Sequence, residues 1–406
     1  MGAQKKVQAG MSVSIGAGIA ALSGFAIIFI SARVLSPSDN ALFLSFWATL
    51  FFATGTLSGI QSEITRAVGS ETIATPPPAS ATLTPYRITL SYGVIVSIIV
   101  AAIWLLSHSN DPLGPTLFTT AIMMIAVILY TGQVTTLGIL GGLRNWLSFG
   151  MLNSAEALLR LASVFFVAFT IQTSQGFAAA TVLGFSAWIF FSYTRQLRRA
   201  LRTRIALPAR RLAKNILSAI ASAGATALLI NGFPTLMLLT TPAAEFSQSS
   251  DLILAVSVTR APLLVPLFAF QSVIISYYLG SPEKRRSTTK KIFGGVFAFT
   301  IILAPVVALF GTDVMSFVFG PAYANSALTL TVLAIDAALL ALLVLGGTIT
   351  IALNRYKECL IGWYSCAAGA LAILLLPLPL EVRTLLALTI SPLIGISIHF
   401  KTILRP

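Results

Sequence analysis

Ionisable side chains inside long apolar stretches are the residues of this sequence best suited to do chemistry. Four fall at such positions: Glu156, Arg160, Arg260 and Asp336. A charge at the centre of a bilayer costs about 2.5 kcal/mol or more, so such a residue persists where it faces a partner or a water-filled cavity. An arginine cannot shed its proton, and its planar guanidinium binds phosphate oxygens through two parallel hydrogen bonds. The arginines therefore predict a cavity that binds an anion.

Glu156 and Arg160 are four residues apart, so a helix places them on one face. Two interpretations fit this spacing. The residues form a self-neutralising pair that packs against neighbouring helices, or they belong to a polar patch that lines a water-filled cavity. Asn153 lies on the same side and favours the second interpretation. We therefore include Arg160 in a predicted cationic cavity, with Glu156 and Asn153 as supporting polar residues.

Arg260 has no acidic residue within four positions of its own stretch, and Asp336 is an acid in a later stretch. One interpretation pairs the two across the C-terminal half of the chain. The other assigns Arg260 to an anionic substrate, because guanidinium matches the geometry of phosphate oxygens, and leaves Asp336 as an ion-coupling candidate. Arg33, at the end of the first apolar stretch, either snorkels to the outer headgroups or joins the same cationic cavity.

Helix-breaking residues interrupt two of the apolar stretches. The sequence Asn-Gly-Phe-Pro at 231–234 falls in one, and Pro262 comes two residues after Arg260 in the next. Proline removes a backbone hydrogen bond and kinks a helix, and interrupted helices border the substrate sites of many transporters. Glycine and proline are also common in membrane helices without such a role. We predict Gly232, Pro234 and Pro262 as hinge or gate positions.

The composition excludes a soluble protein. The chain has 406 residues, of which 56% are hydrophobic and 9% charged, and its mean hydropathy is +0.91. An ordinary soluble domain has about 25% charged residues, so this chain could not cover a soluble surface. The net charge of +14 would suggest nucleic acid in a soluble protein. Here Lys and Arg in loops serve to orient a membrane protein, so we expect no nucleic-acid partner.

The sequence carries no sign of an enzyme or a cofactor. It contains two histidines, His108 and His399, and it has no metal-ligand cluster and no glycine-rich phosphate loop. The segments between the apolar stretches are short, which leaves no room for a polar catalytic domain. We therefore expect no catalytic residue, no metal and no cofactor.

Twelve apolar stretches are long enough to cross a membrane as helices of about 20 residues. Their limits are 11–34, 41–62, 86–107, 115–137, 149–170, 176–194, 215–240, 252–278, 292–310, 326–353, 359–379 and 384–400. Most Lys and Arg residues fall on one side of this arrangement, as the positive-inside rule requires. The sequence therefore predicts an all-α, polytopic protein of the cytoplasmic (inner) cell membrane, with both termini in the cytoplasm.

The longest charged segment, 195–214, has six of these stretches before it and six after it. An even number of spans in each half gives the two halves the same orientation in the membrane. We predict an N-terminal six-helix bundle at 1–194, a basic cytoplasmic linker at 195–214 and a C-terminal six-helix bundle at 215–406.

This layout and three short motifs resemble one transporter family. Ala32–Ser36 followed by Ala41–Phe43 is similar to the pattern A-R-x-L-G … Y-G-x-F of the polysaccharide and O-antigen flippases, with serine at 36 and alanine at 41 in place of its glycines. Phe319–Tyr323 resembles the family's F-G-x-x-Y, and Asn354–Lys357 resembles its short basic turn. These flippases belong to the multidrug/oligosaccharidyl-lipid/polysaccharide (MOP) exporter superfamily.

The resemblance implies a flippase that carries a polyprenyl-pyrophosphate-linked oligosaccharide from the cytoplasmic to the outer leaflet, for cell-surface polysaccharide synthesis. Two halves would rock around a central cationic cavity, by alternating access, while the lipid tail stays in the bilayer. Arg33 matches the motif arginine, whereas Arg160 and Arg260 are assigned from burial and charge alone. The implied partners are the lipid-linked glycan, membrane lipids, and glycan polymerase or glycosyltransferase machinery.

Two other functions stay open. A drug or metabolite antiporter of the same superfamily, coupled to H⁺ or Na⁺, would rely on intramembrane carboxylates, for which the chain offers Glu156 and Asp336. A membrane glycosyltransferase or ligase is the third candidate, although it would need a larger polar outer loop than this sequence provides.

Overall fold

The computed structural model of the protein is helical throughout the residues that it describes, which are 3–73, 84–109, 111–191, 194, 198, 201–205, 207–280, 285–353 and 355–404. Ten helices in these segments are long and apolar enough to cross a membrane. The same segments contain no β-strand. The predicted all-α membrane fold is therefore confirmed.

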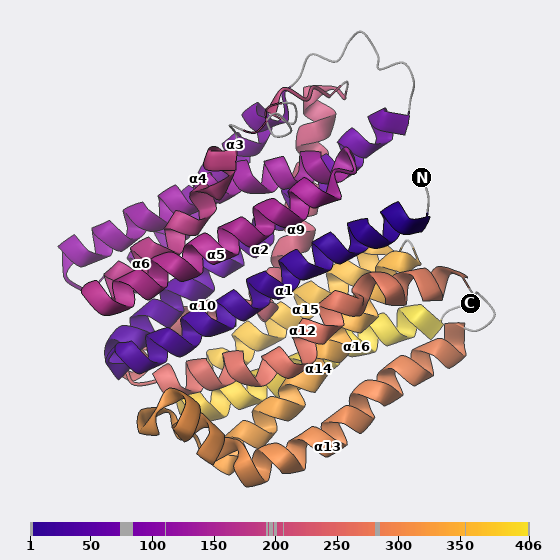
Figure 1. Ribbon diagram of the computed structural model, residues 1–406. Helices are drawn as coiled ribbons and strands as arrows, with labels where there is room; N and C mark the ends of the chain where they lie inside the picture. Colours follow the sequence, from indigo (N-terminus) through magenta and orange to yellow (C-terminus); the bar gives the residue numbers. More distant parts are fainter. Residues whose placement is uncertain are drawn as a thin grey trace. The chain divides into compact units, whose positions relative to one another are not determined.

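Ten of the twelve predicted spans each overlap one helix (Figure 1). The described part of the sixth, 176–194, is divided among α6, η1 and α7, and the seventh, 215–240, between α9 and α10. The first part of the chain forms α1 (Ala3–Val34), α2 (Pro37–Ile73), α3 (Pro85–Ser107), α4 (Leu113–Gly142), α5 (Trp146–Thr170), α6 (Ser174–Leu183), the 3₁₀ turn η1 (Gly184–Ser186), α7 (Ala187–Phe191) and α9 (Ala209–Ile230). The second part forms α10 (Phe233–Thr240), α11 (Ala243–Phe246), α12 (Ser250–Gly280), α13 (Arg285–Phe319), the 3₁₀ turn η3 (Pro321–Tyr323), α14 (Ala327–Ala352), α15 (Tyr356–Leu374) and α16 (Leu380–Leu404).

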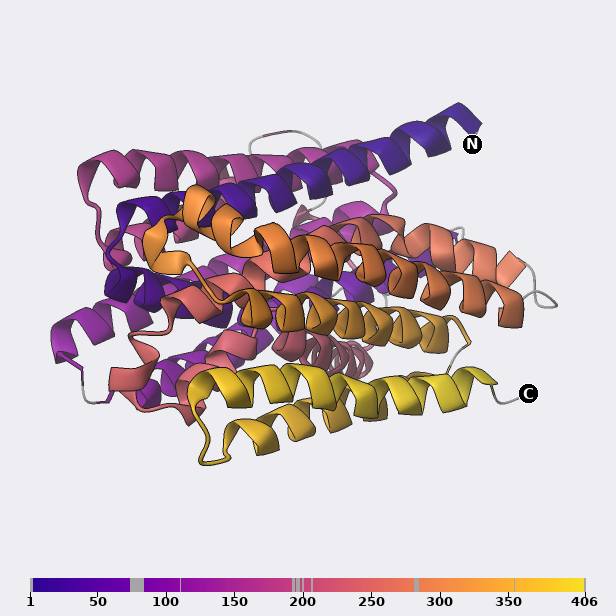
Figure 2. The ribbon, with the colours of Figure 1, turned by 90° about the horizontal axis from the view of Figure 1, so that it is seen from below.

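The helices form two compact units. Unit 1 contains Met1–Leu35 and Ser45–Gly232, and unit 2 contains Ser36–Leu44 and Phe233–Pro406. In unit 1, α1 packs along α5, and α3 packs along α4. In unit 2, α14 packs against α12, α13 and α16, and Figure 2 shows it between α13 and α16.

Helix α2 begins in unit 2 and continues in unit 1. Its first turns are fixed to unit 2 by Asn40, which is fully buried and whose Nδ2 donates a hydrogen bond to the hydroxyl of Tyr323 at 2.8 Å. Tyr323 closes the motif Phe319–Tyr323, in which Gly320 has a φ of 115°. Residues with a side chain rarely adopt this backbone conformation, so the motif glycine is required for the turn that presents Tyr323.

Helix α9 packs with unit 1 through a close approach to α2. A Cβ atom at Gly59 of α2 would lie 2.4 Å from the carbonyl carbon and oxygen of Ala219 in α9, so a residue with a side chain does not fit at this crossing. Small residues at such contacts let two membrane helices approach backbone to backbone. This contact explains why the helix at 209–230 groups with the helices that precede it.

The unit boundary thus falls between Gly232 and Phe233, whereas the predicted bundles meet at the linker 195–214. Part of that linker lies outside the described residues, and its last residues, 209–214, form the first turns of α9. The division of the protein into two working six-helix bundles stays a prediction.

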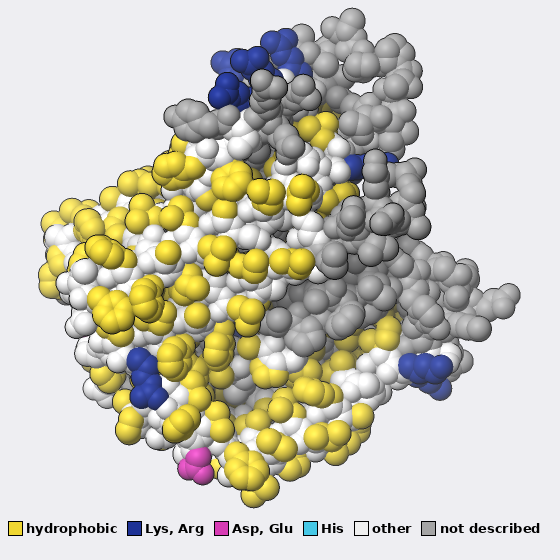
Figure 3. Space-filling view, in the orientation of Figure 1, with side chains coloured by type: hydrophobic (Ala, Val, Ile, Leu, Met, Phe, Trp, Pro, Cys, Tyr) yellow, Lys and Arg dark blue, Asp and Glu magenta, His cyan; other side chains and the backbone are white. Residues whose placement is uncertain are grey.

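Apolar side chains cover much of the described surface, as Figure 3 shows for one face. On α13, Phe317 is 83% exposed and Leu309 is 72% exposed. Water-soluble monomers rarely expose contiguous apolar surface on this scale, whereas lipid tails solvate it without cost. Lys and Arg occupy only a few separate patches on the face shown. The structure therefore agrees with a multi-pass membrane protein.

Candidate functional site

The predicted pair in α5 is an ion pair. Arg160 Nη1 lies 2.9 Å from Glu156 Oε1, and the two residues are only 3% and 5% exposed. The α-helix places them one turn apart on the same face, and the carboxylate comes first, which is the favourable order along a helix. The self-neutralising pair of the two sequence interpretations is therefore present. A role for Arg160 at a cavity stays a prediction.

Three aromatic rings surround the Arg160 guanidinium in unit 1. The guanidinium carbon is 5.6 Å from the ring centroid of Trp47, 5.0 Å from that of Phe51 and 5.9 Å from that of Phe185. A cation near the face of an aromatic ring is attracted by its quadrupole, and the attraction strengthens when water is excluded. The charge of Arg160 is thus held by one carboxylate and three rings. Asn153, on the same helix, is half-buried.

Gly184 allows η1 to lie against this pair. A Cβ atom at Gly184 would be 2.7 Å from Arg160 Cβ and 2.9 Å from the Glu156 carbonyl oxygen. The missing side chain brings Phe185 next to the guanidinium. The close packing of η1 against α5 at Gly184 therefore helps to enclose the Glu156–Arg160 ion pair.

Arg260 and Asp336 form a second charged cluster, in unit 2. Arg260 of α12 is 7% exposed, and its guanidinium carbon lies 5.6 Å from the centroid of the Phe233 ring in α10. Asp336 of α14 is 3% exposed, and its Oδ1 accepts a hydrogen bond from Thr389 Oγ1 of α16 at 2.7 Å. The opposite charges of the two residues attract each other. Four helices thus converge on this cluster.

The Asp336 carboxylate is not saturated by hydrogen bonds. Its second oxygen, Oδ2, is buried and has no hydrogen-bond partner among the described residues. Buried polar atoms usually have partners, so an unsatisfied carboxylate oxygen marks a position where a proton, a cation or a rearranged side chain can bind. Within the described residues Glu156 Oε1 and Arg160 Nε also lack a hydrogen-bond partner, but Glu156 Oε1 lies 2.9 Å from Arg160 Nη1 in an ion pair.

The three arginines predicted to share one cavity lie in different units. Arg33 and Arg160 belong to unit 1, and Arg260 belongs to unit 2. Arg33 is exposed and occupies the last turn of α1, where a positive charge complements the negative end of the helix dipole.

The predicted hinge residues have different surroundings. Gly232 and Pro234 are buried and lie on the two sides of the unit boundary, after α9 ends at Ile230. Pro234 sits in the first turn of α10, where proline costs no backbone hydrogen bond. Pro262 is exposed, and α12 continues through it as an unbroken helix. The predicted interruption at 231–234 is thus present, whereas Pro262 does not end a helix; movement at these positions stays a prediction.

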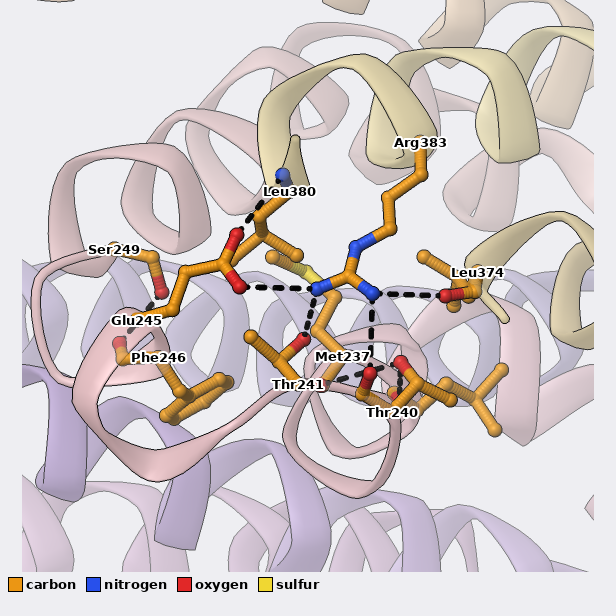
Figure 4. A network of polar contacts seen from close by, with 10 residues as sticks. Met237, Thr240, Thr241, Glu245, Phe246, Ser249, Leu374, Leu380 and Arg383 are labelled. Atoms are coloured by element: carbon orange, nitrogen blue, oxygen red, sulfur yellow. Dashed lines mark hydrogen bonds and ion pairs between the residues drawn. The ribbon is translucent and has the colours of Figure 1, made fainter. Parts of the chain in front are cut away.

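Arg383 of α16 is a buried arginine that lies one residue before the last predicted span, 384–400. It is 6% exposed, and its Nη1 donates hydrogen bonds to the carbonyl oxygens of Thr240 and Leu374, each at 3.1 Å (Figure 4). Its Nη2 donates to Thr241 Oγ1 at 3.1 Å and lies 3.5 Å from Glu245 Oε2. The carbonyl groups at the ends of α10 and α15 have no partner within their own helices, and Arg383 supplies one. Its partners lie up to 143 residues away, so sequence spacing carries no signal of this contact.

Comparison with known sequences gives no match to a family model. The uncharacterized protein Rv3630 of Mycobacterium tuberculosis is 31% identical over 401 residues, which cover 97% of this chain and 91% of that protein. The chain belongs to the Rv3630 family. A second relative, the uncharacterized protein Rv1510 of Mycobacterium tuberculosis, is 30% identical over 387 residues, covering 94% of this chain and 88% of its own length.

Solved structures show which fold this member of the Rv3630 family has. An inward-facing multidrug resistance transporter of the MATE family, in the MOP superfamily, matches with a TM-score of 0.71 at 13% identity, over 99% of this chain and 98% of its own. A MOP superfamily transporter of Pyrococcus furiosus, described as having a binding pocket of reverse polarity, matches with a TM-score of 0.68 at 15% identity, over 98% and 95%. The Rv3630 family member therefore has the MATE-like fold of membrane transporters, as the resemblance to MOP exporters implied.

Proposed function

We propose that the protein is a flippase that moves a polyprenyl-pyrophosphate-linked oligosaccharide from the cytoplasmic to the outer leaflet by alternating access. The observation that carries the proposal is the buried cluster of Arg260 and Asp336. A guanidinium attracted by a carboxylate can exchange it for a diphosphate, which offers more oxygens at a higher charge. A transporter fold supplies the setting in which this exchange moves a substrate.

The charge balance inside the spans supports an anionic substrate. Glu156 and Asp336, the two acids within the predicted spans, each have an arginine that attracts them. Arg33 adds an exposed positive charge at the motif position. We assign the diphosphate to Arg260, and we give Arg160 a structural part because its pair with Glu156 is enclosed by aromatic rings. Glycan polymerase or glycosyltransferase machinery would use the product at the outer face.

A second candidate function is an ion-coupled antiporter for a drug or metabolite. The unpartnered Oδ2 of Asp336 favours it, since a buried carboxylate oxygen with no partner is suited to bind H⁺ or Na⁺. Transport that depends on a gradient of either ion and that accepts an organic cation, with no effect on lipid-linked glycans, would identify this function instead.

We expect that depletion of the protein stops a lipid-linked glycan precursor from reaching the outer leaflet. The precursor should accumulate on the cytoplasmic side, because its charged head cannot cross the hydrocarbon core unaided. Accessibility to a membrane-impermeant glycan-modifying probe, applied to intact cells and to inverted vesicles, measures the distribution. Re-expression of the wild-type chain is the control. Unchanged accessibility in a strain without a redundant flippase contradicts the proposal.

We also propose that the protein lies in the cell membrane with both termini on the cytoplasmic side. Reporter fusions after residues 110, 245 and 313 should read as outside, and fusions after residues 205 and 286 as inside. The reason is that Lys and Arg in short loops remain on the cytoplasmic side. Paired alkaline phosphatase and green fluorescent protein reporters give opposite signals on the two sides. The same signal at two neighbouring loops, such as those after residues 245 and 286, would mean that the span between them is absent.

A further inference from the structure

Unit 2 contains a polar cavity of about 380 Å³ that none of the roles above uses. It lies where α12, α14 and α16 begin, next to α11 and the turn that follows η3. Its polar wall consists mainly of carboxylates and amides, contributed by Glu245, Gln248, Ser249, Asp251, Asn325 and Glu381. Among the residues that the structure describes, no Lys, Arg or His lines it.

Asn325 lines this cavity and carries an unused acceptor. The residue is 6% exposed, and its Nδ2 donates a hydrogen bond to Asp251 Oδ2 at 3.1 Å. Its backbone oxygen accepts a hydrogen bond from Thr312 Oγ1 at 2.9 Å, which fixes the turn. Its Oδ1 is buried and has no hydrogen-bond partner among the residues that the structure describes. A donor from outside the chain is the simplest way to satisfy this atom.

The carboxylates at the cavity are not equally satisfied. Glu245 accepts a hydrogen bond from the backbone N–H of Leu380 at 3.1 Å and lies 3.5 Å from Arg383, as Figure 4 shows. Glu381 accepts a hydrogen bond from Thr329 Oγ1, and within the described segments neither Glu381 nor Asp251 forms an ion pair. Burial raises the pKa of Asp251, and repulsion from Glu381 adds to this rise. A bound positive charge would relieve the repulsion.

The geometry narrows the class of cation. Three acidic, histidine or cysteine side chains placed to hold a metal ion directly do not occur in the described part of the chain. The cavity volume of about 380 Å³ is about 13 times the roughly 30 Å³ that one water takes up in liquid. A primary ammonium group has three N–H donors and a positive charge, which match two carboxylates and one amide oxygen.

We propose that this cavity binds a primary ammonium group, held by Asp251, Glu381 and the Oδ1 atom of Asn325. The side chains lie outside the predicted spans and, in the proposed topology, at the outer face. The group belongs to an amino sugar or to an ethanolamine headgroup, since both present the same ammonium. The inference does not depend on which lipid-linked substrate the protein moves.

Binding to the full-length protein in nanodiscs of phosphatidylglycerol, a lipid without an amine, tests the proposal. Isothermal titration calorimetry is run with glucosamine, with phosphoethanolamine and with N-acetylglucosamine, whose amine is neutralised. At least one of the two amines should bind saturably. The one that binds more tightly shows whether the ammonium group comes from an amino sugar or from an ethanolamine headgroup. N-acetylglucosamine should not bind. Absence of saturable binding by both amines, or equal binding of N-acetylglucosamine, overturns the proposal.

Substitutions locate the site. Asp251→Asn and Glu381→Gln should each weaken amine binding by about tenfold or more, because each removes one negative charge that faces the ammonium group. Asn325→Ala should weaken it as well, through loss of the Oδ1 acceptor. Asp313→Asn, which removes an exposed carboxylate of α13, is the matched control and should bind as the wild type does.

Two outcomes separate the alternatives. If Asp313→Asn weakens amine binding as much as Asp251→Asn does, the effect comes from the overall surface charge, and the proposal is overturned. Saturable binding of Ca²⁺ that Asp251→Asn abolishes and that glucosamine does not displace would mean a metal site instead, and would also overturn it. Thermal unfolding of each variant confirms that it is folded. Because the assay measures binding and not transport, its failure is distinct from failure of the flippase proposal.

Discussion

Replacement of Glu156 by glutamine is expected to lower the free energy of unfolding by about 3–5 kcal/mol. The substitution leaves the buried guanidinium of Arg160 without the carboxylate that lies 2.9 Å away. The aromatic rings around Arg160 stay in place but carry no compensating charge. Unfolding of the purified protein in mixed detergent micelles, followed by circular dichroism and tryptophan fluorescence, measures the loss.

Two further variants show whether the pair itself is responsible. Glu156→Gln combined with Arg160→Met should regain most of the lost stability, because no unpaired charge remains. Arg66→Met is a comparison variant, since it breaks the Glu63–Arg66 ion pair of α2, in which the arginine side chain is 56% exposed and the glutamate side chain 8% exposed. That loss should be smaller than the loss at Glu156, because Glu63 keeps the hydrogen bond from Asn215. A double variant no more stable than Glu156→Gln would contradict the electrostatic explanation.

The second large effect is expected at Arg260. Arg260→Gln should lower the rate of lipid-linked glycan translocation roughly 10- to 100-fold, which corresponds to the loss of a charged hydrogen bond to the diphosphate. Arg260→Lys keeps the charge but not the two parallel donors, so it should retain an intermediate rate. Flipping of a fluorescent polyprenyl-pyrophosphate oligosaccharide in proteoliposomes gives the rate.

The combination with Asp336→Asn separates a substrate-binding role from a structural one. Arg260→Gln alone leaves the Asp336 carboxylate buried without its cation, so it also destabilises unit 2. Arg260→Gln with Asp336→Asn should regain stability while translocation stays low. Recovery of translocation in the double variant would show that Arg260 only balances the charge of Asp336. Loss of ion-dependent transport in Asp336→Asn alone would support the antiporter.

The fold was predictable because the bilayer leaves a chain few choices. Long apolar stretches must form helices, since no water is present to satisfy backbone groups, and stretch length alone locates them. The interruption in the seventh stretch was also predictable from the sequence, because Gly232 and Pro234 lie where α9 ends and α10 begins. Proline was a weaker guide at Pro262, where the helix continues.

The candidate site was predictable only as far as local spacing reaches. The four-residue interval gave the Glu156–Arg160 pair, but the rings of Trp47 and Phe185 come from other elements. The environment of Arg383 is a stronger example, since Thr240 lies 143 positions away in the chain. Contacts of this kind depend on which helices pack together, and no single-sequence pattern records that choice.

The bond between Asn40 and Tyr323 has a consequence for how the protein is made. Its two residues are 283 positions apart, although both belong to unit 2. At a synthesis rate of 5–20 residues per second, the start of α2 leaves the ribosome roughly 14–60 s before its partner. Unit 2 therefore cannot form this contact until residue 323 has been synthesised. The two units are consequently not separable by cutting the gene once.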